Sequence, residues 1–200
     1  MKLFSTVVLV VLFTLSGFAQ SHKEEITKNA ETYYEYMTNQ NFDGVLDYMY
    51  PKVFDKLSRE QMKLGMEQMF NSPEMKIEFV SNKVTDVSDK MDVEDITYAA
   101  VFYNSKMRMT FISEKDKPEE EQKSFLEFMS GIMKTQFGET NVTSDLKTLS
   151  LLVNMDANMF AIKDPKYKGW KFIGNDDAMK ELVDSIIPES IRTKLLKTKD

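Results

Sequence analysis

The chain has 200 residues, and 32 acidic against 26 basic side chains give it a formal net charge of −6. Nucleic acids and anionic membranes repel a net negative chain, so we expect neither as a partner. Cysteine is absent and histidine occurs once, as His22 near the N-terminus, which argues against disulfides, cysteine nucleophiles and histidine-based catalysis; we also predict no metal and no cofactor.

The first residues have the pattern of a secretory signal peptide. A positive residue precedes an apolar run over 7–15, which is too short to span a bilayer. Gly17 and Ala19 supply small side chains at the two positions that a signal peptidase needs. We expect removal of 1–19 and a single exported domain, 20–200, in the periplasm or outside the cell and without a membrane span. The alternative for the apolar run is a membrane anchor or a buried helix.

Helices are predicted first after the cleavage site. Apolar residues at steps of three or four favour a helix that begins near Lys23 and carries Tyr33 and Met37 on one stripe. A break over 41–44 separates it from a short helix. That helix ends before Pro51, because the residue ahead of a proline avoids the helical conformation.

A third helix is predicted to begin at Ser58, which forms a capping box with Gln61, and to end at Pro73. The pattern then changes from helix to strand. A strand is predicted over 77–87, with a change of phase near 81–82 that indicates a bulge. The N-terminal part of the domain is thus helical, and sheet follows it.

Two further strands are predicted over 96–103 and 106–111, joined as a hairpin at 104–105. In the second of them polar and apolar residues alternate. Met107 and Met109 therefore face one side of the sheet, and the polar residues between them face the other.

The C-terminal half also mixes helix and strand. A helix is predicted over 118–137, because proline and acidic residues suit its first turn and Gly138 suits its end. Strands follow over 149–155, 159–162 and 170–173, and then further helices. The order of elements predicts an α+β fold, with N-terminal helices packed on a strongly curved, cone-like antiparallel sheet, an extra helix between strands and C-terminal helices.

The segment 163–172, KDPKYKGWKF, places four lysines among aromatic residues. It suits either a stacking platform for a nucleic acid or a sugar, or the tip of a β-hairpin. We favour the hairpin, because a platform needs a wider electropositive groove than one loop supplies. The lysines are then solvated and Trp170 faces the core.

Three further groups of residues suit a chemical role but also have a structural explanation. The chain has 15 methionines, and some of their spacings, as at Met62, Met66 and Met69, suit ligands of copper(I). The same spacings are those of one face of a helix, where methionine fills the core. Methionine also lines pockets for apolar ligands. An acidic cluster over 86–95 lacks the spacing and the glycine of a calcium loop. Tyrosines are dense over 33–50, and a tyrosine hydroxyl can donate a hydrogen bond to an oxyanion in an active site. We favour the alternative, in which the rings pack in the core and the hydroxyls contact solvent.

The stretch ETYYEYMTNQNFDGVLDYMYPKVF, over 31–54, resembles the opening of the nuclear transport factor two-like superfamily, also called SnoaL-like or cystatin-like α+β. The segments NMFAIKD and GWKFIGND, within 158–176, resemble the family's last hairpin, in which an aromatic strand covers the cone. In pattern the resemblance spans about 23–113 and 148–175. The helix predicted over 118–137 departs from the family's simple pattern and would cover the mouth of the cone.

Membership would imply a curved sheet folded around a long helix, with a pocket that has an apolar floor. The superfamily includes isomerases, cyclases, dehydratases and non-catalytic binding or assembly modules. Dehydratase-like members rely on a histidine–aspartate pair, and this chain has no histidine in the predicted body of the fold.

We therefore expect an exported, soluble, non-enzymatic domain that binds a small apolar ligand or a partner protein. The alternatives are an isomerase- or cyclase-like enzyme that uses a tyrosine and a carboxylate in the cone pocket, and an assembly subunit; a homodimer is also open. The residues expected to line the pocket are Tyr33, Met37, Tyr98, Met107, Met109 and Trp170.

Overall fold

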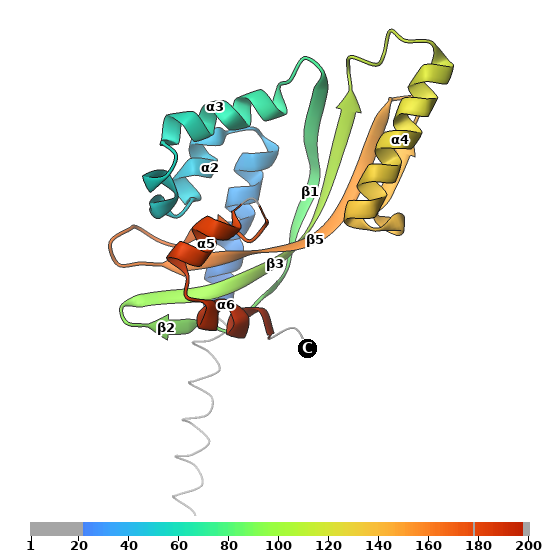
Figure 1. Ribbon diagram of the computed structural model, residues 1–200. Helices are drawn as coiled ribbons and strands as arrows, with labels where there is room; N and C mark the ends of the chain where they lie inside the picture. Colours follow the sequence, from blue (N-terminus) through green and yellow to red (C-terminus); the bar gives the residue numbers. More distant parts are fainter. Residues whose placement is uncertain (1–21, 178, 198–200) are drawn as a thin grey trace, which may run out of the picture.

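The computed structural model of the protein describes residues 22–177 and 179–197 (Figure 1). Helices come before, between and after the strands of one six-stranded sheet. All strand pairs are antiparallel, in the order β1-β3-β5-β4, with β2 beside β3 and β6 beside β5. The sheet is curved and does not close, which confirms the predicted α+β fold. The predicted signal peptide, 1–19, lies outside the described residues.

The elements follow one another much as the sequence predicts. The helices before the sheet are residues 22–38, which we call the N-terminal helix, α2 (Phe42–Tyr48), the 3₁₀ helix η1 (Pro51–Asp55) and α3 (Arg59–Phe70). The strands are β1 (Met75–Val87), β2 (Met91–Val93), β3 (Ile96–Phe111), β4 (Val142–Asp145), β5 (Ser150–Lys163) and β6 (Lys171–Gly174). The other helices are α4 (Glu119–Phe137), the 3₁₀ helix η2 (Glu139–Asn141), α5 (Lys180–Ile186) and α6 (Glu189–Leu196). Within the two described ranges, no helix is both long and apolar enough to cross a membrane.

Side chains fix the ends of several helices. Asn41 accepts a hydrogen bond from the Gly44 backbone N–H across 3.1 Å at the start of α2. The predicted capping box of α3 is confirmed: Ser58 Oγ accepts from the Gln61 N–H across 3.2 Å, and Gln61 Oε1 accepts from the Ser58 N–H across 3.0 Å. Gly138 ends α4 with a φ of 98°, a conformation that favours glycine.

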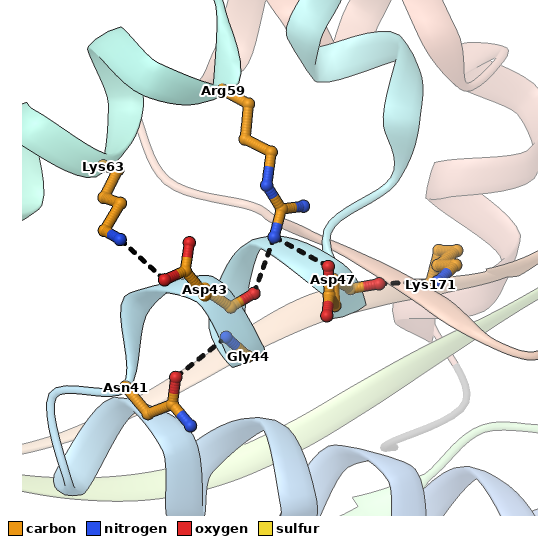
Figure 2. A network of polar contacts seen from close by, with 7 residues as sticks. All are labelled: Asn41, Asp43, Gly44, Asp47, Arg59, Lys63 and Lys171. Atoms are coloured by element: carbon orange, nitrogen blue, oxygen red, sulfur yellow. Dashed lines mark hydrogen bonds and ion pairs between the residues drawn. The ribbon is translucent and has the colours of Figure 1, made fainter.

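An ion-pair network on the surface joins α2 to α3 and to β6 (Figure 2). Lys63 donates to the Asp43 carboxylate across 2.6 Å, and this bond holds the pKa of that carboxyl below its ordinary value. Arg59 donates to the Asp47 carboxylate across 2.7 Å and to the Asp43 carbonyl across 2.9 Å. Lys171 donates to the Asp47 carbonyl, and partial burial lowers the pKa of the Lys171 ammonium group. Each of these exposed pairs adds little to the free energy of folding. Together the contacts fix the position of α2 relative to α3 and β6.

β3 is one continuous strand, so the hairpin predicted at 104–105 is wrong. Both residues pair with β1 on one side and with β5 on the other. Asn104 Nδ2 donates to Asp156 Oδ1 across 3.0 Å, and Ser105 Oγ donates to Asn82 Oδ1 across 2.7 Å. Neighbouring strands thus satisfy the polar side chains that suggested a turn, and the strand continues through them.

β5 is likewise a single strand where two were predicted, over 149–155 and 159–162. Asp156 and Ala157, which lie between those ranges, keep the ladder intact by pairing with Asn104 and Tyr103. The long strands β3 and β5 therefore cross the whole sheet and bend together, as Figure 1 shows.

The bulge predicted near 81–82 is confirmed. The pairing of β1 with β3 shifts between Phe79 and Ser81, and again between Val84 and Asp86. A bulge leaves one residue out of the ladder and bends the strand locally. Both irregularities lie within β1, whose strand curves with the rest of the sheet.

The two faces of the sheet pack against different helices. Tyr98 and Phe102 of β3 lie on one face, in a cluster with residues of α5 and α6. Ala99 and Val101 lie on the other, in a cluster with the N-terminal helix. We call this second face the N-helix face. Alternation along β3 places further residues on it, among them Tyr103, Ser105, Met107 and Met109.

Two other clusters cover the remainder of the N-helix face. Leu126 of α4 packs with Met109 near the end of β3. Phe42 of α2 and Phe70 of α3 pack with Ile77 of β1. The middle of the face therefore lies between three groups of helices.

Candidate ligand pocket

A cavity of about 200 Å³ lies between the N-terminal helix and the middle of the N-helix face. The N-terminal helix, β1, β3, β5 and the end of β6 with the residues after it all contribute to its wall. The lining residues are Tyr33, Tyr34, Met37, Phe79, Asn82, Tyr103, Ser105, Met155, Met159, Gly174 and Asp176. The cavity thus depends on segments that are far apart in the sequence.

The periods of helix and strand place these side chains. Tyr33 and Met37 are four residues apart and so lie one above the other on the helix. Tyr103 and Ser105 are two residues apart on β3 and share a face. Met155 of β5 lies opposite Ser105 in the ladder. Because the buried Ser105 side chain is small, space is left beneath the helix that a larger residue would fill.

Aromatic rings form one wall of the cavity. The ring centre of Tyr34 lies 5.3 Å from that of Tyr33 and 4.9 Å from that of Tyr103, both in tilted or edge-on geometry. Such arrangements are the favoured ones for aromatic pairs. The Tyr34 hydroxyl donates to Met159 Sδ across 3.5 Å. These contacts hold the helix at a fixed distance from the sheet.

The hydroxyl groups of this wall are neutral. Burial raises the pKa of Tyr33, of Tyr34 and of Tyr103 above the ordinary value of 10.0. Neighbouring tyrosines raise it further at Tyr33 and Tyr34, and the Asp176 carboxylate does so at Tyr33 and Tyr103. A neutral phenol both donates and accepts hydrogen bonds. The wall can therefore bind polar groups of a ligand while its rings contact the apolar part.

Among the described lining residues, Asp176 supplies the only carboxylate. Its side chain is exposed at the edge of the cavity, and Oδ1 accepts from the Met179 backbone N–H across 3.0 Å. Oδ2 lies over Gly174, since a methyl group at position 174 would come within 2.9 Å of it. Gly174 thus provides the space in which the carboxylate lies.

Of the predicted pocket residues, Tyr33 and Met37 line the cavity. Met107 and Met109 lie on the same N-helix face but farther along β3. Met109 is buried in the cluster beneath α4, and Met107 packs beside it and against the cluster of α2 and α3. The two methionines therefore support the floor next to the cavity without lining it.

Tyr98 and Trp170 lie elsewhere. Tyr98 is on the opposite face of the sheet, in the cluster with α5 and α6. Trp170 is in the core against Ile26 and Ala30 of the N-terminal helix, as the hairpin interpretation predicts. β5 and β6 pair antiparallel on either side of the loop, which confirms that 163–172 is a hairpin.

Sequence reasoning missed most of the sheet side of the cavity, including Tyr103, Ser105, Met155 and Met159. A signal for two of them was present: read as one strand, β3 puts Tyr103 and Ser105 on the face of Met107. The assumed turn at 104–105 broke that alternation.

A larger, open groove of about 620 Å³ lies elsewhere on the molecule. Residues that line it include Arg108, Lys115, Asp145 and Lys147. Its described lining contains no aromatic ring and is mostly polar, so it lacks the surface that an apolar ligand needs.

The acidic cluster over 86–95 pairs with lysines. Asp89 lies 3.0 Å from Lys23, and Asp92 lies 3.3 Å from Lys90. Within residues 22–177 and 179–197, no group of three or more histidine, cysteine, aspartate or glutamate side chains could hold a metal ion.

Comparison of the chain with protein-family models, with curated proteins and with solved structures finds no match. The resemblance to the nuclear transport factor two-like superfamily therefore stays a prediction.

Proposed function

We propose that the protein is a binding domain for a small, largely apolar molecule, held between the N-terminal helix and the sheet. The observation that carries the proposal is the cavity of about 200 Å³ with its wall of three neutral tyrosines. Pockets for drug-sized ligands are roughly 300–1,000 Å³, so the ligand has about the size of one substituted ring.

The lining combines adaptable and directional groups. The thioethers of Met37, Met155 and Met159 adjust to the shape of an apolar ligand. The Tyr33 and Tyr103 hydroxyls supply hydrogen bonds that fix its orientation. A mostly apolar pocket with a few polar groups is the usual form of a small-molecule site.

The compartment and the family are part of the same proposal. Removal of 1–19 would send the domain to the periplasm or out of the cell. A pocket between the first long helix and a curved sheet is where the resemblance to the nuclear transport factor two-like superfamily implies one. The position of the cavity supports that membership, and we propose a cone-like, non-enzymatic member.

An isomerase- or cyclase-like enzyme is the second candidate. The Asp176 carboxylate is close enough to Tyr33 and Tyr103 for its charge to raise the pKa of both hydroxyls. Such an enzyme would use the carboxylate to move a proton and a tyrosine to stabilise an oxyanion. We favour binding without catalysis, since Asp176 is exposed at the edge and its Oδ1 is engaged with the Met179 N–H.

The sequence is also compatible with a partner protein as the ligand. Phe128 and Ile132 of α4 are 65% and 44% exposed and lie one turn apart. Exposed apolar side chains are common on protein surfaces, whereas a lined cavity is rarer. The small molecule is therefore the better-supported ligand.

Native mass spectrometry of residues 20–200, purified gently from an exporting host, tests the proposal. We expect the mass of the chain plus one small molecule. Met37→Trp fills the cavity from the helix and should abolish that added mass. Met69→Trp is the matched control, since Met69 is 51% exposed on α3 and does not line the cavity. Bare wild-type chain, both as purified and after incubation with a small-molecule extract of the host, would show that the proposal is wrong.

A further inference from the structure

We infer that the ligand is an organic cation: an amine or ammonium group joined to a small apolar body. The inference rests on the proposed function, because it names the class of molecule that the same cavity selects. It goes further in assigning Asp176 as the group that holds the charge.

The charged residues that line the cavity and the hollow beside it are all acidic. Asp176 is the only charged residue in its described lining, and no lysine or arginine is among those residues. A shallower hollow of about 360 Å³ adjoins the cavity and shares Tyr34 and Asn82 with it. Glu31 and Glu35 line that hollow. Carboxylates at both places raise the local concentration of cations and repel anions.

The rings of the cavity suit the same ligand. Tyr33, Tyr34, Tyr103 and Phe79 present four aromatic side chains to a volume of about 200 Å³. The face of an aromatic ring carries partial negative charge and attracts ammonium groups. The hydroxyls in this wall remain neutral, as shown above, so they add acceptors for an ammonium N–H without the cost of a buried phenolate.

Asp176 is placed to complete the site. Its Oδ1 is held by the Met179 N–H, and Oδ2 has no hydrogen-bond partner among the described residues. Oδ2 lies over Gly174, whose missing side chain gives it room. An ammonium group in the cavity would therefore meet the rings on one side and a free carboxylate oxygen on the other.

Three probes that share a ring and differ in charge test the inference: benzylamine, benzyl alcohol and benzoate. Isothermal titration of the mature chain should give benzylamine an affinity at least about tenfold above that of benzyl alcohol, with benzoate weakest. Asp176→Asn should bring benzylamine down to the affinity of the alcohol. Binding of the alcohol, which needs no charge, should persist in this variant and shows that it is folded.

Two further variants separate charge from position. Asp177→Asn removes the same charge one residue along, where the side chain is exposed and does not line the cavity, and should leave selectivity intact. Gly174→Ala keeps the charge but pushes Oδ2 aside, because its methyl group would lie 2.9 Å from that oxygen. Because Gly174 itself lines the cavity, the variant is read by the ratio of the two affinities, which should fall toward one as benzylamine loses more affinity than benzyl alcohol.

Failure of the inference can be told from failure of the proposed function. Equal binding of amine and alcohol, with no effect of Asp176→Asn, would overturn the cation and keep the binding domain. A neutral or acidic molecule found in the native complex would do the same. If no probe binds and the native chain carries no added mass, both proposals fall.

Discussion

Trp170→Ala is expected to lower the free energy of unfolding by about 3–5 kcal/mol, the usual cost of removing a large buried aromatic side chain. Trp170 is 1% exposed and packs against Ile26 and Ala30 of the N-terminal helix and Phe172 of β6. Its loss would open a cavity between helix and sheet. Unfolding in urea should be followed by circular dichroism, because Trp170 is the only tryptophan.

Trp170→Phe is the matched control. Within the described residues, the indole Nε1 is buried and has no hydrogen-bond partner. Phenylalanine keeps most of the packing and removes that unsatisfied N–H, so the expected loss is only about 1 kcal/mol. If alanine at this position cost no more than phenylalanine, the ring would not be part of the core.

The second large effect is expected at a buried hydrogen bond between the residue before η1 and the β5–β6 hairpin. The Tyr50 hydroxyl donates to Asp164 Oδ2 across 2.9 Å, and the two residues are 1% and 2% exposed. Asp164 Oδ1 also accepts from the Lys166 N–H across 3.0 Å. Burial and this bond raise the pKa of Tyr50, which stays protonated and donating. Tyr50→Phe should cost about 2 kcal/mol and Asp164→Ala about 2–3 kcal/mol, because each leaves a buried polar group without its partner.

A double-mutant cycle tests this pair, again by urea unfolding. Removing both partners should cost about 1–2 kcal/mol less than the sum of the single changes. Asp164→Asn is the control, since its amide oxygen can still accept from Tyr50. Additive single changes would show that the two side chains do not depend on each other for stability.

Much of the fold could be predicted because the signals are local. The capping box of Ser58 and Gln61, the end of α4 at Gly138 and the bulge near Ser81 each depend on a few neighbouring residues. The order of helices and strands then limits the fold to an α+β class. Those predictions needed no knowledge of which strands pair.

The errors arose where partners are distant. Asn104 and Ser105 suit a turn by composition, but Asp156 and Asn82 satisfy them across the sheet. The bond between Tyr50 and Asp164 joins residues 114 positions apart, and no local pattern predicts it. Contacts between residues far apart in the sequence therefore determine both the continuous strand at 104–105 and the hydrogen bond of Tyr50.

The candidate pocket divides in the same way. Its helix side, with Tyr33 and Met37, follows from the helical stripe. Its sheet side depends on the register that brings Met155 opposite Ser105, and on the segment after β6 that places Asp176 at the edge. Register and loop position are set by the assembled fold, so the sequence alone could name only part of the wall.

Methionine methyl resonances provide the most direct test of binding in this cavity. Residues 20–200, labelled at the methionine methyl groups and assigned by substitution, would be titrated with benzylamine and with benzyl alcohol. We expect the methyl signals of Met37, Met155 and Met159 to shift and saturate together, while that of Met69 on α3 stays in place. Shifts confined to other methionines, or no saturable shift with either probe, would contradict a ligand site between the N-terminal helix and the sheet.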